Sequence, residues 1–315
     1  ASVLFRDRLD AHRLIEEFMI LANVAAAETL LAARSPLLFR VHEEPNPEKL
    51  DALRETAQSA GFNLAKGQVL KTQHLNALLN AAAGTEDAEL INISTLRSMT
   101  QAYYSPSNFG HFGLALQSYA HFTSPIRRYA DLIVHRALIT AHGWGDDGLS
   151  PEGVENLEAT AGHISETERR SMLAERDTND RYLASYLSER IGNEFTGRIS
   201  GIARFGVFVK LDETGADGLI PMRELGREYF RFDAESNTLT GSETGVTIGL
   251  GQRVLVRLTE AAPVTGGIAL ELLELEDKKL PSGSGRRRGG PVRSKSSKAK
   301  RKADKLKRKV ARKRR

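Results

Sequence analysis

The spacing of apolar residues changes near Phe195, and this change constrains the fold more than any other feature of the sequence. Before it, apolar residues recur mostly every three or four positions, which is typical of helices with one buried face. After it, apolar and polar residues alternate, as in GVFVKL at 206–211, which is typical of half-buried strands. The sequence therefore predicts an α+β protein, with a mostly helical part followed by a small β domain.

The helical part divides into several segments separated by proline, glycine and polar residues. Proline favours the first turn of a helix and glycine favours the position just after its end. The pattern predicts a long helix over 1–34 that ends near Ser35 and Pro36, and a helix from about Glu155 to Arg190. Shorter packing helices are expected at 45–60, 67–82 and 86–99, and a loop is expected at 143–153. We interpret 67–82 and 86–99 as structural scaffold.

The run HFGLALQSYAHFTSPIRRYADLIVHR at 111–136 mixes polar and basic groups into an apolar sequence. Pro125 suits a first helical turn, so a helix is expected to begin near Ser124, capped by Ser124 or Thr123. Arg127 and Arg128 would then lie beside free backbone N–H groups at the positive end of the helix. Such a helix start attracts phosphate.

The residues after Pro125 leave a second interpretation open. Ile126, Tyr129, Ile133 and Ala137 recur at spacings of three and four, which predicts one buried face. The segment is then an ordinary amphipathic helix with solvated arginines. Spacing alone does not decide between a phosphate site and this alternative.

The same run resembles, position by position, the signature of the ribonuclease II and ribonuclease R family of processive 3′-to-5′ exoribonucleases. RLIEEFMILANVAAAE at 13–28 and SETERRSMLAERDTND at 165–180 resemble two helices of that family. The resemblance covers residues 1 to about 275. It implies that 1–192 is the C-terminal part of the catalytic domain, the RNB-type domain, and that the intact enzyme hydrolyses RNA to nucleoside monophosphates.

The resemblance assigns roles to several side chains. Arg127 matches an arginine that binds phosphate in the catalytic chamber, and a guanidinium can hold two phosphate oxygens at once. Glu175 matches a glutamate near the outgoing nucleotide, where a carboxylate can accept bonds from sugar hydroxyls. Arg128 either assists Arg127 or pairs with an acid. Glu16 and Glu17 are the candidates for the side of the cavity that holds the metal.

Other polar residues of this region are expected to support the structure. His111, His121 and His135 are assigned structural or hydrogen-bonding roles, and Asp131 is expected to pair with an arginine. Tyr119 and Tyr129 are expected in the core. Glu175 has its own alternative, a surface glutamate paired with an arginine.

The metal ligands of the family are the main departure from the resemblance. Family members hold Mg²⁺ with a set of aspartates, because two hard cations bound by carboxylates can activate water. Only Asp7 and Asp10 precede the helix at 13–28, so no metal ligand is identified. The start at Ala1, without methionine, suggests a piece of a longer chain. Cleavage of RNA by these residues alone is not expected, and a non-catalytic RNA-binding module is the alternative function.

Residues 193–277 resemble the ribosomal S-one RNA-binding motif, a five-stranded oligonucleotide-binding barrel. Its last two strands are expected at RVLVRLTEAA and GGIALELLEL. Phe205 and Phe208 match aromatic residues on which bases stack, and Arg204 and Lys210 are candidates for phosphate contacts. The alternative is that both phenylalanines belong to the core.

The barrel segment departs from its family at two points and carries one insertion. Pro221 replaces a common histidine, and 262–267 lacks the usual acid and arginine. Sequence-independent binding still fits, and these departures bear on its affinity. The insertion at 226–247 carries aromatic residues that are expected to cap the barrel, namely Tyr229, Phe230 and Phe232.

The composition shifts abruptly at Lys278. Residues 278–315 hold 19 lysines and arginines and one acid, giving +18, so the preceding residues carry −13 of the overall +5. A segment with almost no large apolar residue cannot bury a core and is expected to be disordered. Its charge favours RNA, and the arm is expected to recruit structured RNA or ribosomes while the channel takes single strands. A solubilising tail is the alternative, and a chromatin-like binder driven by this tail would bind duplex DNA equally well.

The absence of cysteine and of targeting segments limits the compartment and the kinds of site that are expected. The chain has no cysteine, which excludes disulfides and cysteine-bound zinc. It has no visible signal peptide or membrane span, so a cytoplasmic protein is expected. We expect a monomer whose main partner is the 3′ end of a single-stranded RNA.

Overall fold

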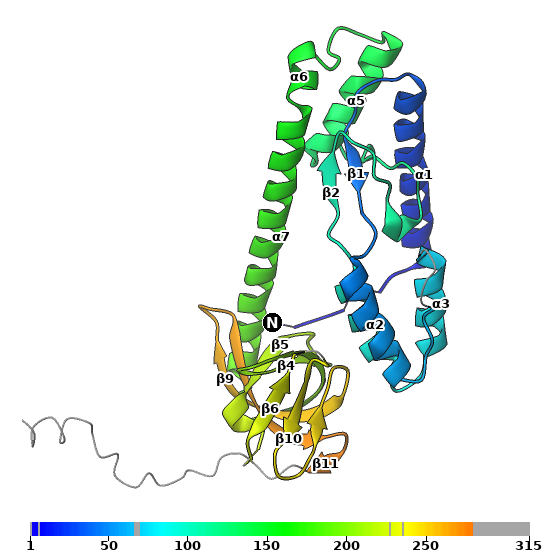
Figure 1. The fold of residues 1–315 in the computed structure, drawn as a ribbon. Helices are drawn as coiled ribbons and strands as arrows, with labels where there is room; N and C mark the ends of the chain where they lie inside the picture. The colour runs from blue at the N-terminus through cyan, green and yellow to red at the C-terminus, as the bar shows by residue number, and fades with distance from the viewer. Residues whose placement is uncertain (1, 6, 66–69, 227, 235, 280–315) are drawn as a thin grey trace, which may run out of the picture.

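The computed structural model describes residues 2–5, 7–65, 70–226, 228–234 and 236–279. The helical part precedes the barrel, and α7, which spans Leu157–Ser188, runs the length of the molecule and ends at the barrel (Figure 1). The other α-helices are α1 (Asp10–Ala32), α2 (Pro47–Ser59), α3 (Thr72–Ala82), α4 (Ala88–Ser98), α5 (Tyr129–His142) and α6 (Pro151–Glu155). Two 3₁₀ turns, η1 (Phe112–Leu114) and η2 (Met222–Glu224), also occur.

Local sequence explains where α2 begins and ends. Pro47 occupies the first turn, and the side chain of Asn46 accepts a hydrogen bond of 2.8 Å from the backbone N–H of Glu48. Gly61 follows the helix with a φ of +80°, a conformation that glycine adopts without steric cost. The prediction of a helix over 45–60 is confirmed.

Other predicted helix boundaries need correction. The helix expected over 1–34 begins only at Asp10, where His12 Nδ1 accepts a hydrogen bond of 3.1 Å from the Leu9 N–H. The loop expected at 143–153 contains α6, because Ser150 caps it by accepting from Gly153 N at 3.1 Å and Pro151 opens it. Part of 67–82 lies outside the described residues, and α3 begins at Thr72.

Three hydrophobic clusters hold the molecule together. The first joins α1, α5 and the start of α7 around a two-stranded antiparallel sheet of β1 (Phe39–Val41) and β2 (Tyr103–Ser105). The second lies among α2, α3 and α4. The third fills the barrel and extends to Ala184 and Leu187 of α7. The end of α7 is therefore part of the core of the barrel.

The β domain is a closed five-stranded barrel, as predicted. Strand β10 pairs in parallel with β5 and antiparallel with β9, and β9 pairs with β3, which closes the sheet. Its strands are β3 (Glu194–Ala203), β4 (Gly206–Leu211), β5 (Asp217–Pro221), β9 (Arg253–Ala262) and β10 (Gly267–Leu275). The two strands predicted from RVLVRLTEAA and GGIALELLEL are confirmed. The remaining residues of the expected tail, 280–315, lie outside the described part, but Lys278–Lys279 pair with β10 as β11.

The insertion forms a three-stranded antiparallel sheet beside the barrel. Its strands are β6 (Phe230–Asp233), β7 (Thr238–Gly241) and β8 (Thr247–Ile248). Phe230 is buried in the barrel cluster and Phe232 packs against that cluster, as the prediction of a capping role requires. Tyr229 is 73% exposed, so it does not take part in the cap. Strand alternation explains this, because neighbouring residues point to opposite faces.

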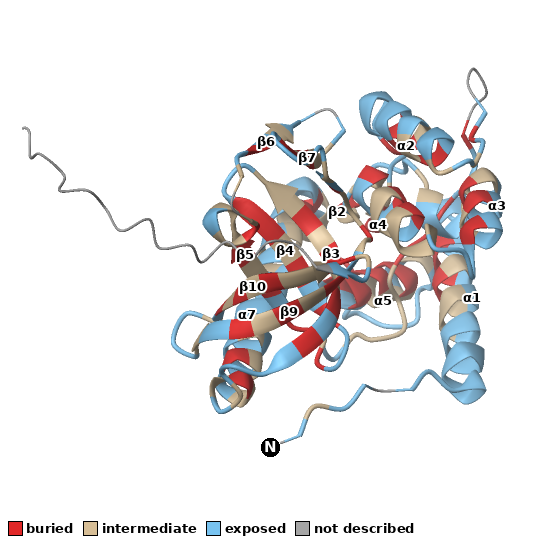
Figure 2. Cartoon of the chain, turned by 90° about the horizontal axis from the view of Figure 1, so that it is seen from below, coloured by how far each residue is buried: buried red, intermediate tan, exposed pale blue. Residues whose placement is uncertain are grey.

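One face of α1 lacks a partner among the described residues. Leu14, Phe18 and Leu21 recur at helical spacing, yet each is more than half exposed. Figure 2 shows the contrast along α1, whose exposed stretch is pale blue. The opposite side of the helix contributes the buried Leu30 to the core.

Candidate nucleic-acid interface

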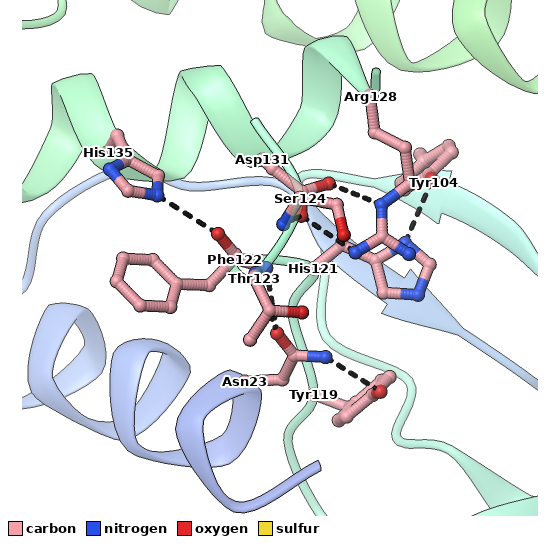
Figure 3. A network of polar contacts seen from close by, with 10 residues as sticks. All are labelled: Asn23, Tyr104, Tyr119, His121, Phe122, Thr123, Ser124, Arg128, Asp131 and His135. Atoms are coloured by element: carbon pink, nitrogen blue, oxygen red, sulfur yellow. Dashed lines mark hydrogen bonds and ion pairs between the residues drawn. The ribbon is translucent and has the colours of Figure 1, made fainter. Parts of the chain in front are cut away.

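The loop at 121–128 lies between α1 and α5 and is held by two buried side chains (Figure 3). Asn23 of α1 accepts hydrogen bonds from the backbone N–H groups of Phe122 and Thr123, at 2.9 and 3.2 Å. Asp131 of α5 accepts one from the Ser124 N–H at 2.7 Å. Both acceptors are almost fully buried. Three successive N–H groups are therefore fixed from opposite sides, and the loop is rigid.

These contacts correct the expected helix start. The helix α5 begins at Tyr129, and 125–127 form a turn in which the N–H groups of Arg127 and Arg128 lie 3.3 and 3.1 Å from the Ser124 carbonyl oxygen. Asn23 and Asp131 bind the N–H groups of 122–124 and fix the backbone that leads into this turn. Ser124 therefore offers no free N–H to phosphate, and neither Ser124 nor Thr123 caps the helix.

The burial predicted for this segment is also partly wrong. Ile126 is fully exposed and Tyr129 is 53% exposed, whereas Ile133 and Ala137 are buried as expected. The helical periodicity fails because Ile126 lies in the turn and not on the helix. Tyr119 is buried as predicted.

Arg128 and Arg127 have different environments although they are neighbours. Arg128 donates to Asp131 through Nε and Nη2, at 2.8 and 2.7 Å, which confirms the expected pairing of Asp131 with an arginine. Arg127 is exposed, and none of the described residues forms a hydrogen bond or ion pair with its guanidinium. Its five N–H donors are thus available to an external anion.

Buried rings form a second layer beneath the loop. The Tyr104 hydroxyl lies 2.9 Å from His121 Nδ1, and the Tyr119 hydroxyl accepts from Asn23 Nδ2 at 2.9 Å (Figure 3). Burial, followed by the positive charges of Arg128 and Arg40, lowers the pKa of His121 to about 3. Burial also raises the pKa of Tyr104 to about 12. Both groups are therefore neutral at physiological pH.

The other two histidines of the segment have contacts that fit a supporting role. Burial, with the nearby His42 and Arg40, lowers the pKa of His111 to about 4. His135 Nε2 lies 2.9 Å from the Phe122 carbonyl oxygen, and its ring stacks on the Phe122 ring at 4.3 Å. The Thr123 hydroxyl is buried without a hydrogen-bond partner among the described residues, so it does not contribute to holding the loop.

The helix α7 carries Glu175 and is tied to the two-stranded sheet. Arg40 of β1 donates to both oxygens of Glu168, at 2.6 and 3.0 Å, and the Tyr104 N–H donates to Ser165 Oγ at 2.9 Å. Glu175 lies further along α7, is exposed, and forms no hydrogen bond or ion pair with a described residue. Its predicted alternative, pairing with an arginine, is not seen. No such contact joins Glu175 to Arg127 either.

The carboxylates that precede and begin α1 do not form a metal site. Glu16 pairs with Arg8, Asp10 lies 3.4 Å from Arg13, and Glu17 is exposed. Across the described ranges, no three carboxylate or histidine side chains are close enough to hold a metal ion. The residues present do not fit a magnesium centre.

The outward face of the barrel strand β4 carries the other predicted RNA contacts. Val207, Val209 and Leu211 point into the core, so alternation places Phe208 and Lys210 on the outer face. Phe205 is 61% exposed, and its ring lies 5.9 Å from the Phe208 ring, edge to face. Arg204 is also exposed. The alternative that both phenylalanines are core residues does not hold, because Phe205 is exposed and Phe208 is only partly buried.

Sequence reasoning missed Asn23 and Arg97. Asn23 is the one polar residue in the apolar run LANVAAA, which was the available signal for a buried polar contact. Arg97 of α4 donates from Nη2 to the Ser200 carbonyl oxygen of β3 at 2.6 Å. No pattern in the sequence indicated that α4 would reach the barrel.

Comparison with known proteins agrees with this architecture. Family models match an RNB domain over residues 2–142 and an S1 RNA binding domain over 188–273. The fold and these matches define a protein that joins RNB-domain sequence to an RNA-binding barrel.

The relatives identify the family more closely. Ribonuclease R of Escherichia coli is 43% identical over 259 residues, covering 80% of this chain and 32% of that protein. The apo form of Mycoplasma genitalium ribonuclease R superposes with a TM-score of 0.80 at 31% identity, covering 86% of this chain and 43% of that one. The same values hold for its complex with ribose-methylated single-stranded RNA. The chain belongs to the ribonuclease R family, and it spans about a third of the length of its curated relatives.

No helix in the described part of the chain is both long and apolar enough to cross a membrane.

Proposed function

We propose that this chain supplies the RNA-binding part of a 3′-to-5′ exoribonuclease that hydrolyses RNA to nucleoside monophosphates. The observation that carries the proposal is the free guanidinium of Arg127 on a loop fixed by Asn23 and Asp131. A planar guanidinium held on a rigid loop can bind two phosphate oxygens without first being ordered. Arg128 supports this loop through its ion pair with Asp131 and assists Arg127.

The proposal assigns the sugar contact to Glu175. Its carboxylate is exposed and unpaired among the described residues, so it is available to accept hydrogen bonds from ribose hydroxyls. Glu16 and Glu17 keep their assignment to the metal side as part of this proposal, although Glu16 is paired with Arg8 here. Mg²⁺ would be bound by carboxylates from the parts of the relatives that this chain does not span.

The domain assignment belongs to the same proposal. Residues 1–192 form the end of the catalytic domain, 193–277 the RNA-binding barrel and 278–315 a basic arm. Phe205, Phe208, Arg204 and Lys210 bind single-stranded RNA on the barrel, and the arm binds structured RNA or the ribosome through its charge. We propose a cytoplasmic monomer.

A second candidate is an RNA-binding module without hydrolysis. The observation in its favour is that no carboxylate cluster fit for a metal exists in the described ranges. On this view the same residues bind RNA, and nothing cleaves it.

One experiment tests whether this chain cleaves RNA by itself. A single-stranded RNA labelled at its 5′ end is incubated with the chain, with and without Mg²⁺, beside a binding titration. Degradation that depends on Mg²⁺ would show that this chain completes a metal site by itself. Binding without degradation is expected from both candidates, and hydrolysis by the complete enzyme then distinguishes the first from the second.

The role of Arg127 is tested in the complete enzyme. Arg127→Ala is expected to lower hydrolysis far more than RNA affinity, and Arg127→Lys restores only part of it because an ammonium does not bind two oxygens in one plane. Near-normal turnover of Arg127→Ala would defeat the assignment. Equal affinity for duplex DNA, unchanged by Arg127→Ala, would favour a binder driven only by the basic arm.

A further inference from the structure

A cleft of about 880 Å³ separates the barrel from the helices α4 and α7. One wall is the outer face of the barrel, with Phe208 and Lys210, and the opposite wall is α4, with Asn92 and Leu96. Leu96 is 74% exposed although it lines this cleft. We propose that α4 is the second wall of the RNA-binding site of the barrel, and that a base of single-stranded RNA lies between Phe208 and the apolar side chains of α4. This inference rests on the proposed RNA-binding role of the barrel.

Close contacts fix the separation between the two walls. The hydrogen bond from Arg97 to Ser200 joins α4 to β3. Gly251 has a φ of +79°, and a Cβ there would lie 2.9 Å from the Leu90 backbone nitrogen of α4. A Cβ on Gly266 would lie 3.2 Å from the Arg181 backbone nitrogen of α7. Because backbone meets backbone, the barrel cannot shift freely, and the cleft is formed before RNA binds.

Gly201 keeps the middle of the cleft open. A Cβ at this position would lie 3.2 Å from Phe208 Cδ2 and 3.5 Å from Arg97 Nη2. A larger residue would therefore push the Phe208 ring or break the contact made by Arg97. The glycine leaves the face of the barrel accessible beside the ring.

The charges of the walls point to a base as the bound group and not to phosphate. Three cations already have partners: Arg97 binds Ser200, Arg198 donates to the Gly251 carbonyl oxygen at 3.2 Å, and Arg176 lies 3.9 Å from Asp180. Of the cations that line the cleft, Lys210 alone forms no hydrogen bond or ion pair with a described residue. The acids along the cleft are Glu89, Asp180, Asp217 and Glu260. Attraction of phosphate is thus largely cancelled, while the apolar surface remains suited to stacking.

The class of ligand follows from this geometry. Bases of a single strand are free to leave their neighbours and enter an apolar slot, whereas those of a duplex are paired and stacked. Every base offers a flat face, so the slot discriminates little among sequences. The cleft therefore takes unpaired RNA.

The absence of cysteine allows a direct test in the full chain. Leu96→Cys is labelled with a benzophenone maleimide, mixed with single-stranded RNA at elevated salt to weaken the contribution of the basic arm, and irradiated. The matched control is Tyr182→Cys, since Tyr182 is also 74% exposed. It lies about 200° further around α7 than Asp180, away from the cleft.

We expect crosslinking at position 96 to exceed that at position 182 several-fold, and to drop in Phe208→Ala or when duplex RNA replaces the single strand. RNA that binds but crosslinks equally at both positions would overturn the inference and leave the proposed function intact. Duplex RNA that crosslinks as strongly as the single strand would also overturn the inference and leave the proposed function intact. If the chain binds no RNA at either low or elevated salt, both the inference and the proposed function are wrong.

A titration gives a second measurement. Stacking on Phe208 corresponds to a loss of about 5- to 150-fold in affinity for single-stranded RNA in Phe208→Ala. Leu96→Ser is expected to lower this affinity less, but more than Tyr182→Ser does. Equal affinities of Leu96→Ser and Tyr182→Ser would contradict a role for α4.

Discussion

The guanidinium of Arg128 and the carboxylate of Asp131 form a two-bond ion pair beneath the loop that presents Arg127. Asp131 has no exposed surface, and the side chain of Arg128 is 19% exposed. A buried carboxylate without its partner is strongly destabilising, because it has lost hydration and gains no compensating contact. Two adjacent arginines thus have separate tasks, one in the structure and one at the surface.

This division predicts unequal effects of the two substitutions on the free energy of unfolding. Arg128→Ala is expected to lower the free energy of unfolding by about 3–5 kcal/mol, since it leaves Asp131 unpaired. Arg127→Ala is expected to change it by less than about 0.5 kcal/mol, as is usual for an exposed side chain. Urea denaturation measures both. Equal losses for the two variants would show that Asp131 does not depend on Arg128.

Asn23 is expected to be essential for holding the loop. Asn23→Ala leaves the N–H groups of Phe122 and Thr123 and the Tyr119 hydroxyl without their partner, and each unsatisfied buried group costs about 1–3 kcal/mol. Tyr119→Phe is the control, because it removes only the hydroxyl. Hydrogen exchange should become much faster at Phe122 and Thr123 in Asn23→Ala but not in Tyr119→Phe. Unchanged exchange in both variants would mean that the loop is held by other contacts.

Stability is expected to fall as the pH is lowered from neutrality. Burial holds the pKa of His121 at about 3 and that of His111 at about 4 in the folded chain, whereas an unfolded histidine titrates near about 6.5. Below about 6.5 the unfolded state therefore binds more protons, so stability is full above that pH and is lost progressively down to the folded pKa values. His121→Gln should flatten this dependence between about pH 6.5 and 5, above the usual range of carboxylates. An unchanged slope in thermal unfolding would contradict the assignment.

The two faces of α1 are expected to respond differently to substitution. Leu30 is fully buried, so Leu30→Ala should cost about 2–5 kcal/mol of unfolding free energy. Phe18 is 58% exposed, so Phe18→Ser should change the free energy of unfolding by less than about 0.5 kcal/mol. Urea denaturation measures both variants. A large loss of stability in Phe18→Ser would show that this face is packed in solution.

Much of the fold could be predicted from the sequence because its signals are local. The change of period at Phe195, the proline that opens α2 and the alternation of β9 and β10 each depend on neighbouring residues alone. The motif around Arg127 also indicated the family, because the order of residues is itself the signal. The arginine that would pair with Asp131 was three positions away and within reach of a local argument.

The sequence by itself determined the types of element, their order and the residue types available to bind RNA. Only the tertiary structure decided where α5 begins, which arginine is free and which helix faces the barrel. Asn23 lies about a hundred positions from Phe122, and Arg97 lies 103 from Ser200. Contacts over such separations depend on how whole elements pack. No local propensity encodes them.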